Sequence, residues 1–242
     1  MTAEQLLDTV WRVGGAGLTD DLDCHCYLIF DGRTGLLVDA GAGRAADRWL
    51  AAVREVCDPA ALGGVLVTHY HADHAGGAAA AARAGLTVLG SRATVAALGC
   101  ADEHATSLAV ARAAGVYPPD YRLRSAPAKP VAPGPLRIGG LDLEVVDAPG
   151  HCDGHVVLLL RTAGRTVLFS GDCLFAGGRV SVQAIHDCRL DRYAGTVIDL
   201  AERGVDVLLP GHAEPVLDGA GADVERAAAS FRRLVPPPNL LS

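Results

Sequence analysis

The run Thr68-His69-Tyr70-His71-Ala72-Asp73-His74 packs three histidines and a carboxylate into six residues. The apolar run Val65-Leu66-Val67 comes directly before it and is preceded by Gly63-Gly64. A short apolar run bounded by glycines is typical of a buried strand. The small-residue run 75–84 that follows predicts a helix packed close to that strand. We therefore expect the cluster at the carboxyl end of a strand, where open α/β sheets bind ligands.

The spacing within this cluster suits metal binding. Side chains two residues apart on an extended segment point the same way, so His69 and His71 can reach one ion together. Asp73 and His74 lie where the chain turns into the helix and can face a second point close by. Imidazole and carboxylate are ligands for zinc, iron or manganese. A lone histidine is more often an ordinary core or surface residue, but four such groups in six residues favour a metal site.

Composition bounds the class of protein. Half of the 242 residues are hydrophobic, so the chain can bury a substantial core in one large domain or two small ones. Only 20% of the residues are charged and the net charge is -7, which argues against a nucleic-acid partner because phosphate binding needs a basic face. Seven cysteines, an odd number, favour reduced thiols over a disulfide framework.

Two observations bear on location. No apolar run reaches the roughly 20 residues that a membrane-spanning helix needs, so no membrane partner is expected. Residues 1–5 lack a basic region followed by an apolar one, so no signal peptide is expected. Together with the reduced cysteines, these features predict a cytoplasmic protein.

Apolar runs separated by turn residues predict alternating strands and helices. In the first half we expect a single short strand within 4–13, a hairpin over 26–38, a helix over 44–56, a strand at 87–89 and helices over 91–99 and 101–114. In the second half we expect hairpins over 136–146 and 156–169, a helix over 190–203, a strand over 205–209 and a helix over 222–234. Strands followed by helices in each half predict two αβ halves packed sheet to sheet, with helices outside.

The segment 101–135 stands out because its second part, 117–135, is rich in proline and poor in strand signals. We interpret 101–135 as an insertion or lid over the site. A surface connection with no catalytic part is an equally good interpretation.

Three later strands are expected to end like the first one. Each apolar run meets one or two small residues and then a histidine or aspartate: His151, Asp172 and His212. Glycine at such a place lets the backbone turn sharply and approach a bound ion closely. Each of the three taken alone is as well explained as a polar loop residue. Their recurrence at the carboxyl ends of several strands favours one shared site.

Four motifs thus appear in order along the chain: His69-Tyr70-His71-Ala72-Asp73-His74, Pro149-Gly150-His151, Ser170-Gly171-Asp172 and Gly211-His212. With them the sequence closely resembles the metallo-β-lactamase superfamily. The resemblance implies an α/β fold, a four-layer αβ/βα sandwich, formed by one domain over 1–242 with two metal ions at one edge of the sheets. It further implies that one ion is held by His69, His71 and His151, that the other is held by Asp73, His74 and His212, and that Asp172 bridges them.

Within the superfamily the chain looks most like the glyoxalase II-like branch. The stretches that carry this likeness are Pro149-Gly150-His151-Cys152-Asp153-Gly154-His155 and Gly171-Asp172-Cys173-Leu174-Phe175. True β-lactamases of the superfamily use a cysteine ligand, whereas Asp172 occupies the bridging position here. Glyoxalase II proper adds a helical C-terminal domain for glutathione and usually reads Gly-Cys-Gly-Arg where this chain has Ala176-Gly177-Gly178-Arg179. The sequence leaves open whether glutathione carries the substrate.

The resemblance implies a metal-dependent hydrolase of the thioesterase or lactonase type. Two divalent ions, with zinc favoured over iron or manganese, would bring the pKa of a bound water near neutral. The hydroxide would attack the carbonyl carbon of a small acyl substrate, and one ion would stabilise the oxyanion. Asp73 is expected to be a metal ligand and is the candidate catalytic proton shuttle.

Two other functions fit the same ligands. Persulfide dioxygenases resemble this branch and use one iron with two histidines and an aspartate. A non-catalytic binding protein on the same scaffold is the other alternative, although such proteins typically lose ligands and this chain keeps the whole set.

Weaker candidates surround these residues. Asp39 could orient a ligand histidine through its ring N–H or could be a turn residue. His155 is expected to be structural, and Tyr70 to face either substrate or core. Cys24-His25-Cys26 has the look of a soft metal site, although no partner pair is evident. Two residues in the loop after the bridging aspartate could meet an anionic substrate or simply be solvated: Arg179 and His186.

Overall fold

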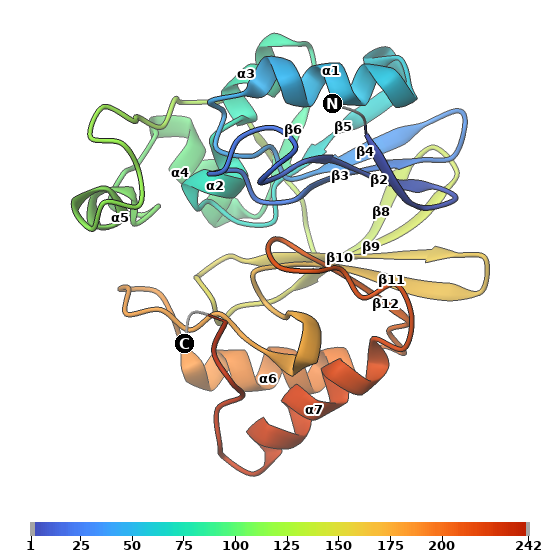
Figure 1. The fold of residues 1–242 in the computed structure, drawn as a ribbon, viewed down its shortest axis with the longest axis vertical. Coiled ribbons are helices and arrows are strands. Elements are labelled where there is room, and N and C mark those ends of the chain that lie inside the picture. The colour runs from blue at the N-terminus through green and yellow to red at the C-terminus, as the bar shows by residue number, and fades with distance from the viewer. Residues whose placement is uncertain (1–2, 241–242) are drawn as a thin grey trace. The chain divides into compact units, whose positions relative to one another are not determined.

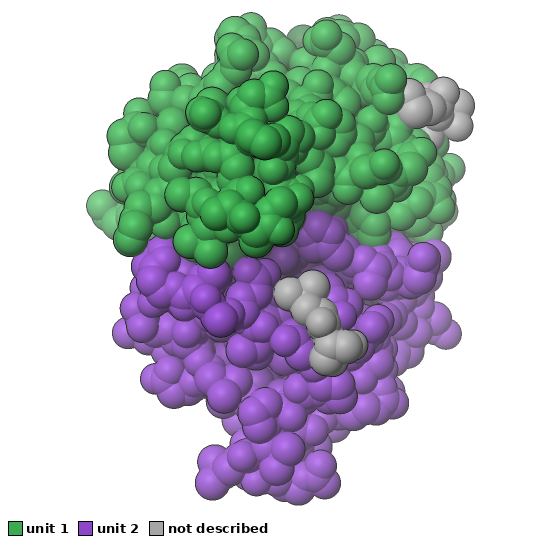
Figure 2. All heavy atoms as spheres, turned by 60° about the vertical axis from the view of Figure 1, so that its left-hand side comes forward, with its two compact units in different colours: residues 1–131, 138–141 green, residues 132–137, 142–242 purple. Residues whose placement is uncertain are grey.

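The computed structural model describes residues 3–240 as two compact units, coloured separately in Figure 2. Unit 1 comprises Met1–Val131 and Ile138–Leu141, and unit 2 comprises Ala132–Arg137 and Asp142–Ser242. Each unit contains one sheet with its own apolar core and its own helices (Figure 1). The ends of the predicted domain, residues 1–2 and 241–242, lie outside the described residues.

The sheet of unit 1 has seven strands in sequence order. They are β1 (Glu4–Leu7), β2 (Val10–Gly14), β3 (Cys26–Phe30), β4 (Gly35–Val38), β5 (Leu62–Leu66), β6 (Val88–Gly90) and β7 (Lys129–Pro130). Pairing is antiparallel from β1 to β4 and parallel from β4 to β7. The carboxyl ends of β4 and β5 therefore lie next to each other at one edge of this sheet.

Helices of unit 1 follow these strands. They are α1 (Ala46–Val56), η1 (Pro59–Ala61), α2 (Ala72–Ala75), α3 (Ala78–Arg83), α4 (Arg92–Cys100) and α5 (Leu108–Ala113). One face of α1 buries Trp49, Leu50 and Val53 in the core that also contains Leu28 and Leu37 of the sheet. This spacing of apolar residues is the one an amphipathic helix presents to a core.

The sheet of unit 2 has five strands in the order β12-β11-β10-β9-β8. They are β8 (Gly134–Ile138), β9 (Leu141–Asp147), β10 (Val156–Thr162), β11 (Arg165–Gly171) and β12 (Val207–Pro210). Because β10 runs antiparallel to both β9 and β11, and β12 runs parallel to β11, the strands β9, β11 and β12 share one direction. Their carboxyl ends therefore share one edge.

The helices α6 (Leu190–Ala201) and α7 (Gly221–Arg232) pack against each other and cover one face of this sheet (Figure 1), and the short η2 (Ala176–Gly178) contacts α7. Val197 of α6 and Phe231 of α7 share a buried cluster with Leu159 and Leu168 of the strands. Each unit is thus a sheet with helices packed on it, as the order of strands and helices predicts.

Two predicted elements are wrong. The segment 4–13 contains two strands, β1 and β2, instead of one. The helix expected over 101–114 begins only at Leu108, because Ala101 and Ser107 adopt left-handed backbone angles, with φ of 52° and 53°. The carboxylate of Asp102 also accepts the backbone N–H groups of the two residues after Glu103, which stabilises a turn there. The other predicted elements appear within a few residues of the expected bounds.

None of the helices within residues 3–240 combines the length and the apolar character that are needed to cross a membrane.

Candidate metal centre

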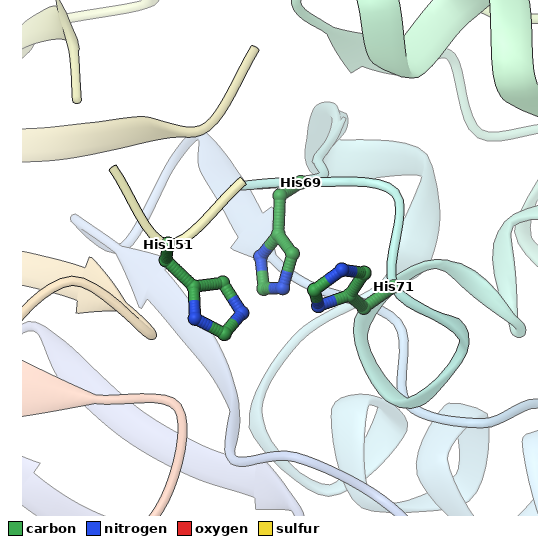
Figure 3. Close-up of side chains that lie close together, drawn as sticks. All are labelled: His69, His71 and His151. Atoms are coloured by element: carbon green, nitrogen blue, oxygen red, sulfur yellow. The ribbon is translucent and has the colours of Figure 1, made fainter. Parts of the chain in front are cut away.

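The ligand set of unit 1 lies at the carboxyl end of β5. The chain stays extended through His71 and enters α2 at the next residue. The ring centroids of His69 and His71 are 4.6 Å apart, and those of His69 and His74 are 4.1 Å apart (Figure 3 shows the first pair). Nε2 of His74 lies 3.6 Å from Oδ2 of Asp73. The structure therefore brings together all four ligands predicted from this segment.

Asp39, at the end of β4, orients His74. Its carboxylate accepts the backbone N–H of Thr68 at 2.7 Å and the Thr68 hydroxyl at 3.0 Å. The same carboxylate lies 2.9 Å from Nδ1 of His74. Since a carboxylate only accepts, the proton of His74 lies on Nδ1, and Nε2 carries the lone pair that binds a metal. The predicted contact of Asp39 with the ring N–H of a histidine is confirmed, and the role of His74 as a metal ligand stays a prediction.

Thr68 orients His69 in the same way. Its one hydroxyl hydrogen is donated to Asp39, so its oxygen accepts from Nδ1 of His69 at 3.1 Å. Nε2 of His69 is then the nitrogen with the lone pair. Sequence reasoning missed Thr68, and its position directly before the first histidine is the only signal for it.

Asp39 has a left-handed backbone, with φ of 62°. Such a conformation costs a non-glycine residue about 1–3 kcal/mol and persists where the surroundings hold it. The hydrogen bonds that the Asp39 carboxylate accepts from Thr68 and His74 stabilise this backbone conformation.

The ligand set of unit 2 lies at the carboxyl ends of β9, β11 and β12. Nε2 of His151, which Figure 3 also labels, is 3.6 Å from Oδ2 of Asp172. Nε2 of His212 is 3.7 Å from Oδ1 of the same carboxylate. Each oxygen of Asp172 thus faces a different histidine, which is the arrangement a bridging carboxylate requires.

These separations fit a divalent ion. Two ligand atoms that each lie about 2.0–2.2 Å from one tetrahedral ion are roughly 3.3–3.6 Å apart. The nitrogen-to-oxygen distances of 3.6 Å and 3.7 Å are close to that range and too long for hydrogen bonds. Each unit therefore presents imidazole nitrogens and carboxylate oxygens with the spacing that a bound divalent ion needs.

Buried hydrogen bonds fix the unit 2 ligands as well. Nδ1 of His151 donates to the carbonyl of Ser181 at 2.9 Å, which leaves the lone pair on Nε2. Nε2 of His155 accepts the backbone N–H of Asp172 at 3.2 Å, so the predicted structural role of His155 is confirmed. The hydroxyl of Tyr193 on α6 shares its one hydrogen between the carbonyl oxygens of Cys173 at 2.6 Å and Asp172 at 2.8 Å, and it accepts the N–H of Ser181 at 3.1 Å.

The sequence gives no signal for Tyr193, because α6 reaches the loops of unit 2 only in the folded chain. Gly150 makes its approach possible, since a Cβ at that position would lie 2.5 Å from the tyrosine ring.

Sγ of Cys24 lies within 4.8 Å of ligand atoms of Asp39 and His74, but burial disfavours the thiolate form that binds metals. Burial raises the pKa of Cys173 to about 12, so its thiol stays protonated at neutral pH, as expected for a residue outside the ligand set. Burial also raises the pKa of Cys24 and of Cys26. The ring nitrogens of His25 lie 3.2 Å from Arg12 and 3.2 Å from Tyr27, which argues against a soft metal site at 24–26.

The other weak candidates fall into ordinary positions. Tyr70 is 4% exposed and belongs to the core. Nε of Arg179 donates to the carbonyl of Ala176, and Nδ1 of His186 lies 3.7 Å from a carboxylate oxygen of Asp187.

The sequence pattern of the metallo-beta-lactamase superfamily matches residues 19–212. The chain belongs to the metallo-β-lactamase superfamily. Hydroxyacylglutathione hydrolases are similar to it: that of Cupriavidus taiwanensis is 34% identical over 162 residues, covering 64% of this chain and 51% of that protein. One from Pseudomonas putida is 30% identical over 158 residues, covering 64% and 49%. The chain thus spans about half the length of these relatives, and the predicted glyoxalase II-like branch of the superfamily is confirmed.

Solved structures show the same superfamily fold. A metallo-β-lactamase of Cronobacter sakazakii superposes with a TM-score of 0.73 at 18% identity, covering 97% of this chain and 92% of that one. A metallo-β-lactamase from Novosphingobium pentaromativorans gives a TM-score of 0.70 at 21% identity, covering 96% and 89%. The predicted fold class is therefore confirmed.

Proposed function

We propose that this chain is a metal-dependent hydrolase that cleaves the thioester, ester or lactone bond of a small acyl substrate. The observation that carries the proposal is the pair of ligand sets, in which neighbouring groups direct Nε2 of His69, His74 and His151 toward a ligand position. Membership of the superfamily and the hydroxyacylglutathione hydrolase relatives support a metal-dependent hydrolase.

In this proposal the chain forms one domain and both ligand sets serve one dinuclear centre, most simply with zinc. His69, His71 and His151 would hold one ion, Asp73, His74 and His212 would hold the other, and Asp172 would bridge them. The two oxygens of Asp172, each facing its own histidine, support the bridging role. When bound, the ions would supply a water of near-neutral pKa and Lewis-acid stabilisation of the developing oxyanion.

The chain's own residues would position the reactants. Asp39 and Thr68 hold His74 and His69 in the metal-binding tautomer. His155 and Tyr193 hold the backbone of Asp172. Asp73 is the candidate to accept the proton of the attacking water, since its side chain remains 22% exposed while the neighbouring histidines are buried. A thiolate leaving group needs no separate acid, because a thiol pKa lies near 8.5.

The name of the hydroxyacylglutathione hydrolases indicates that they hydrolyse a glutathione thioester. Such a thioester is therefore the first substrate to test. The acyl group, the thiol carrier and the cytoplasmic location stay predictions.

The direct test is hydrolysis of a chromogenic thioester and lactone panel by the purified protein, with and without a chelator. We expect turnover that the chelator removes and zinc restores. Hydrolysis that survives complete metal removal would refute the proposal. Oxygen uptake with a persulfide, in protein that loads one iron, would instead establish the dioxygenase alternative.

A further inference from the structure

A pocket of about 380 Å³ opens on the insertion within unit 1. Small-molecule sites typically measure about 300–1,000 Å³. Apolar groups form most of its wall: Leu22, Val116, Pro118, Pro119 and the ring of Tyr117. Val116 is 56% exposed, so this part of the wall is accessible to a ligand.

The two arginines that line this pocket each lie close to a carboxylate that compensates their charge. Arg112 forms a two-pronged ion pair with Glu103, at 3.1 Å and 2.5 Å, and also donates to the carbonyl of Tyr121 at 2.9 Å. Nε of Arg44 lies 3.8 Å from Oδ2 of Asp20. No acidic residue is among the residues that line the pocket. The pocket therefore offers an apolar wall and little net charge to a ligand.

Tyr117 links this pocket to the candidate metal ligands. Its hydroxyl donates to Oδ1 of Asp73 at 3.3 Å, while its ring lines the pocket. The ring stacks on Tyr121 with 4.8 Å between centroids, and the Tyr121 hydroxyl donates to the carbonyl of Ala42 at 2.8 Å. Both rings are more than nine-tenths buried, so the insertion is packed firmly here. The pocket thus lies one tyrosine side chain away from Asp73.

We infer that this pocket receives the apolar acyl chain of the substrate, and this inference rests on the proposed function. In acyl transfer the carbonyl carbon must lie beside the metal ligands, and the acyl chain continues from that carbon. An adjoining pocket of about 400 Å³ is lined by four charged residues and suits a polar group better than a hydrocarbon chain: Arg44, Asp120, Arg122 and Arg124. Of these two pockets, the apolar one beside Tyr117 therefore suits the acyl chain better.

The test compares acetyl, butyryl and hexanoyl thioesters of one thiol. We expect kcat/KM to rise about fourfold for each methylene that the pocket buries. Val116→Asp places a charge in the apolar wall and should remove this preference. Val110→Asp is the matched control, because Val110 lies in the same insertion, is 63% exposed and does not line the pocket.

Binding of hexanoate and acetate, measured by NMR, tests the pocket without turnover. Thioester hydrolysis with no preference for chain length, or equal effects of the two valine variants, would overturn the pocket and leave the hydrolase standing. Tighter binding of hexanoate than acetate, lost in Val116→Asp, would support the pocket even if no thioester were hydrolysed. Equal binding of the two acids by wild type would overturn it.

Discussion

Single side chains set which ring nitrogen carries the proton in two of the proposed metal ligands, His69 and His74. Oδ1 of Asp39 accepts hydrogen bonds from the backbone N–H and the hydroxyl of Thr68, and Oδ2 accepts one from Nδ1 of His74. Asp39 follows β4, and the segment with Thr68 and His74 follows β5, so the parallel pairing of β4 with β5 places them together. The tautomer of His74 is thus a consequence of strand order, since the two residues are 35 positions apart.

Asp39→Asn should weaken metal binding while leaving the fold intact. The amide oxygen would keep the two Thr68 donors, so its NH₂ would face Nδ1 of His74 and drive the ring proton onto Nε2. Loss of such an orienting partner typically costs about 10–100-fold in metal affinity. Asparagine tolerates the left-handed backbone of Asp39. Competition with a chromophoric chelator measures the affinity.

The control is Asp58→Asn, because Asp58 caps η1 by accepting the N–H of Ala60 and lies on the surface. Equal metal affinity of the Asp39 variant and wild type would show that Asp39 does not set the tautomer.

Tyr117→Phe removes only the hydroxyl that donates to Asp73. That hydrogen bond occupies Oδ1 and leaves Oδ2 facing His74. Without it the carboxylate can rotate, so we expect kcat to fall roughly tenfold with KM little changed. Tyr121→Phe is the control, since its hydroxyl bonds to backbone carbonyls. A larger loss of kcat in Tyr121→Phe than in Tyr117→Phe would contradict this role.

At the scale of elements, close packing of loops on strands positions the ligands. Gly77 lies between α2 and α3, and a Cβ there would lie 2.0 Å from the carbonyl oxygen of Ala40. The same contact region contains the hydrogen bond from the N–H of Ala40 to the carbonyl of His74 at 2.9 Å. The glycine therefore lets the helical segment approach the end of β4.

Gly77→Ala should destabilise the protein by about 1–3 kcal/mol, because the added methyl forces the backbone apart. Gly99→Ala is a matched control, since a Cβ there has nothing within 4 Å and alanine favours the helix α4 by about 0.8–1.0 kcal/mol. Denaturant unfolding measures both. Equal stability of the two variants would contradict the packing account.

The sequence predicts most elements of this chain because their apolar periods and turn residues are local. It fails over 101–114, where the left-handed Ala101 and Ser107 break a helical pattern. It also fails to show Thr68 and Tyr193, because their partners come from other strands or loops. The histidine cluster can be predicted from the sequence because four of the predicted ligands lie within six consecutive residues. The hydrogen bonds that orient them are tertiary.

At the scale of the whole molecule, the two units supply their predicted ligands differently. In unit 2, three strands of one direction end at the same edge of the sheet, and each is followed by one predicted ligand after one or more small residues. Unit 1 contributes four ligands from one segment, and unit 2 contributes one from each of three strand ends. The sequence motifs predict this ligand inventory. Their service to one centre remains the central claim to be tested.

The metal content of wild type and of one variant in each unit tests that claim most directly. Wild type should contain two ions per chain by mass spectrometry, and His71→Ala in unit 1 and Asp172→Asn in unit 2 should each lose metal and hydrolysis together. His186→Ala, outside the ligand set, should retain both. If Asp172→Asn kept two ions and full activity, a centre shared between the two ligand sets would be contradicted.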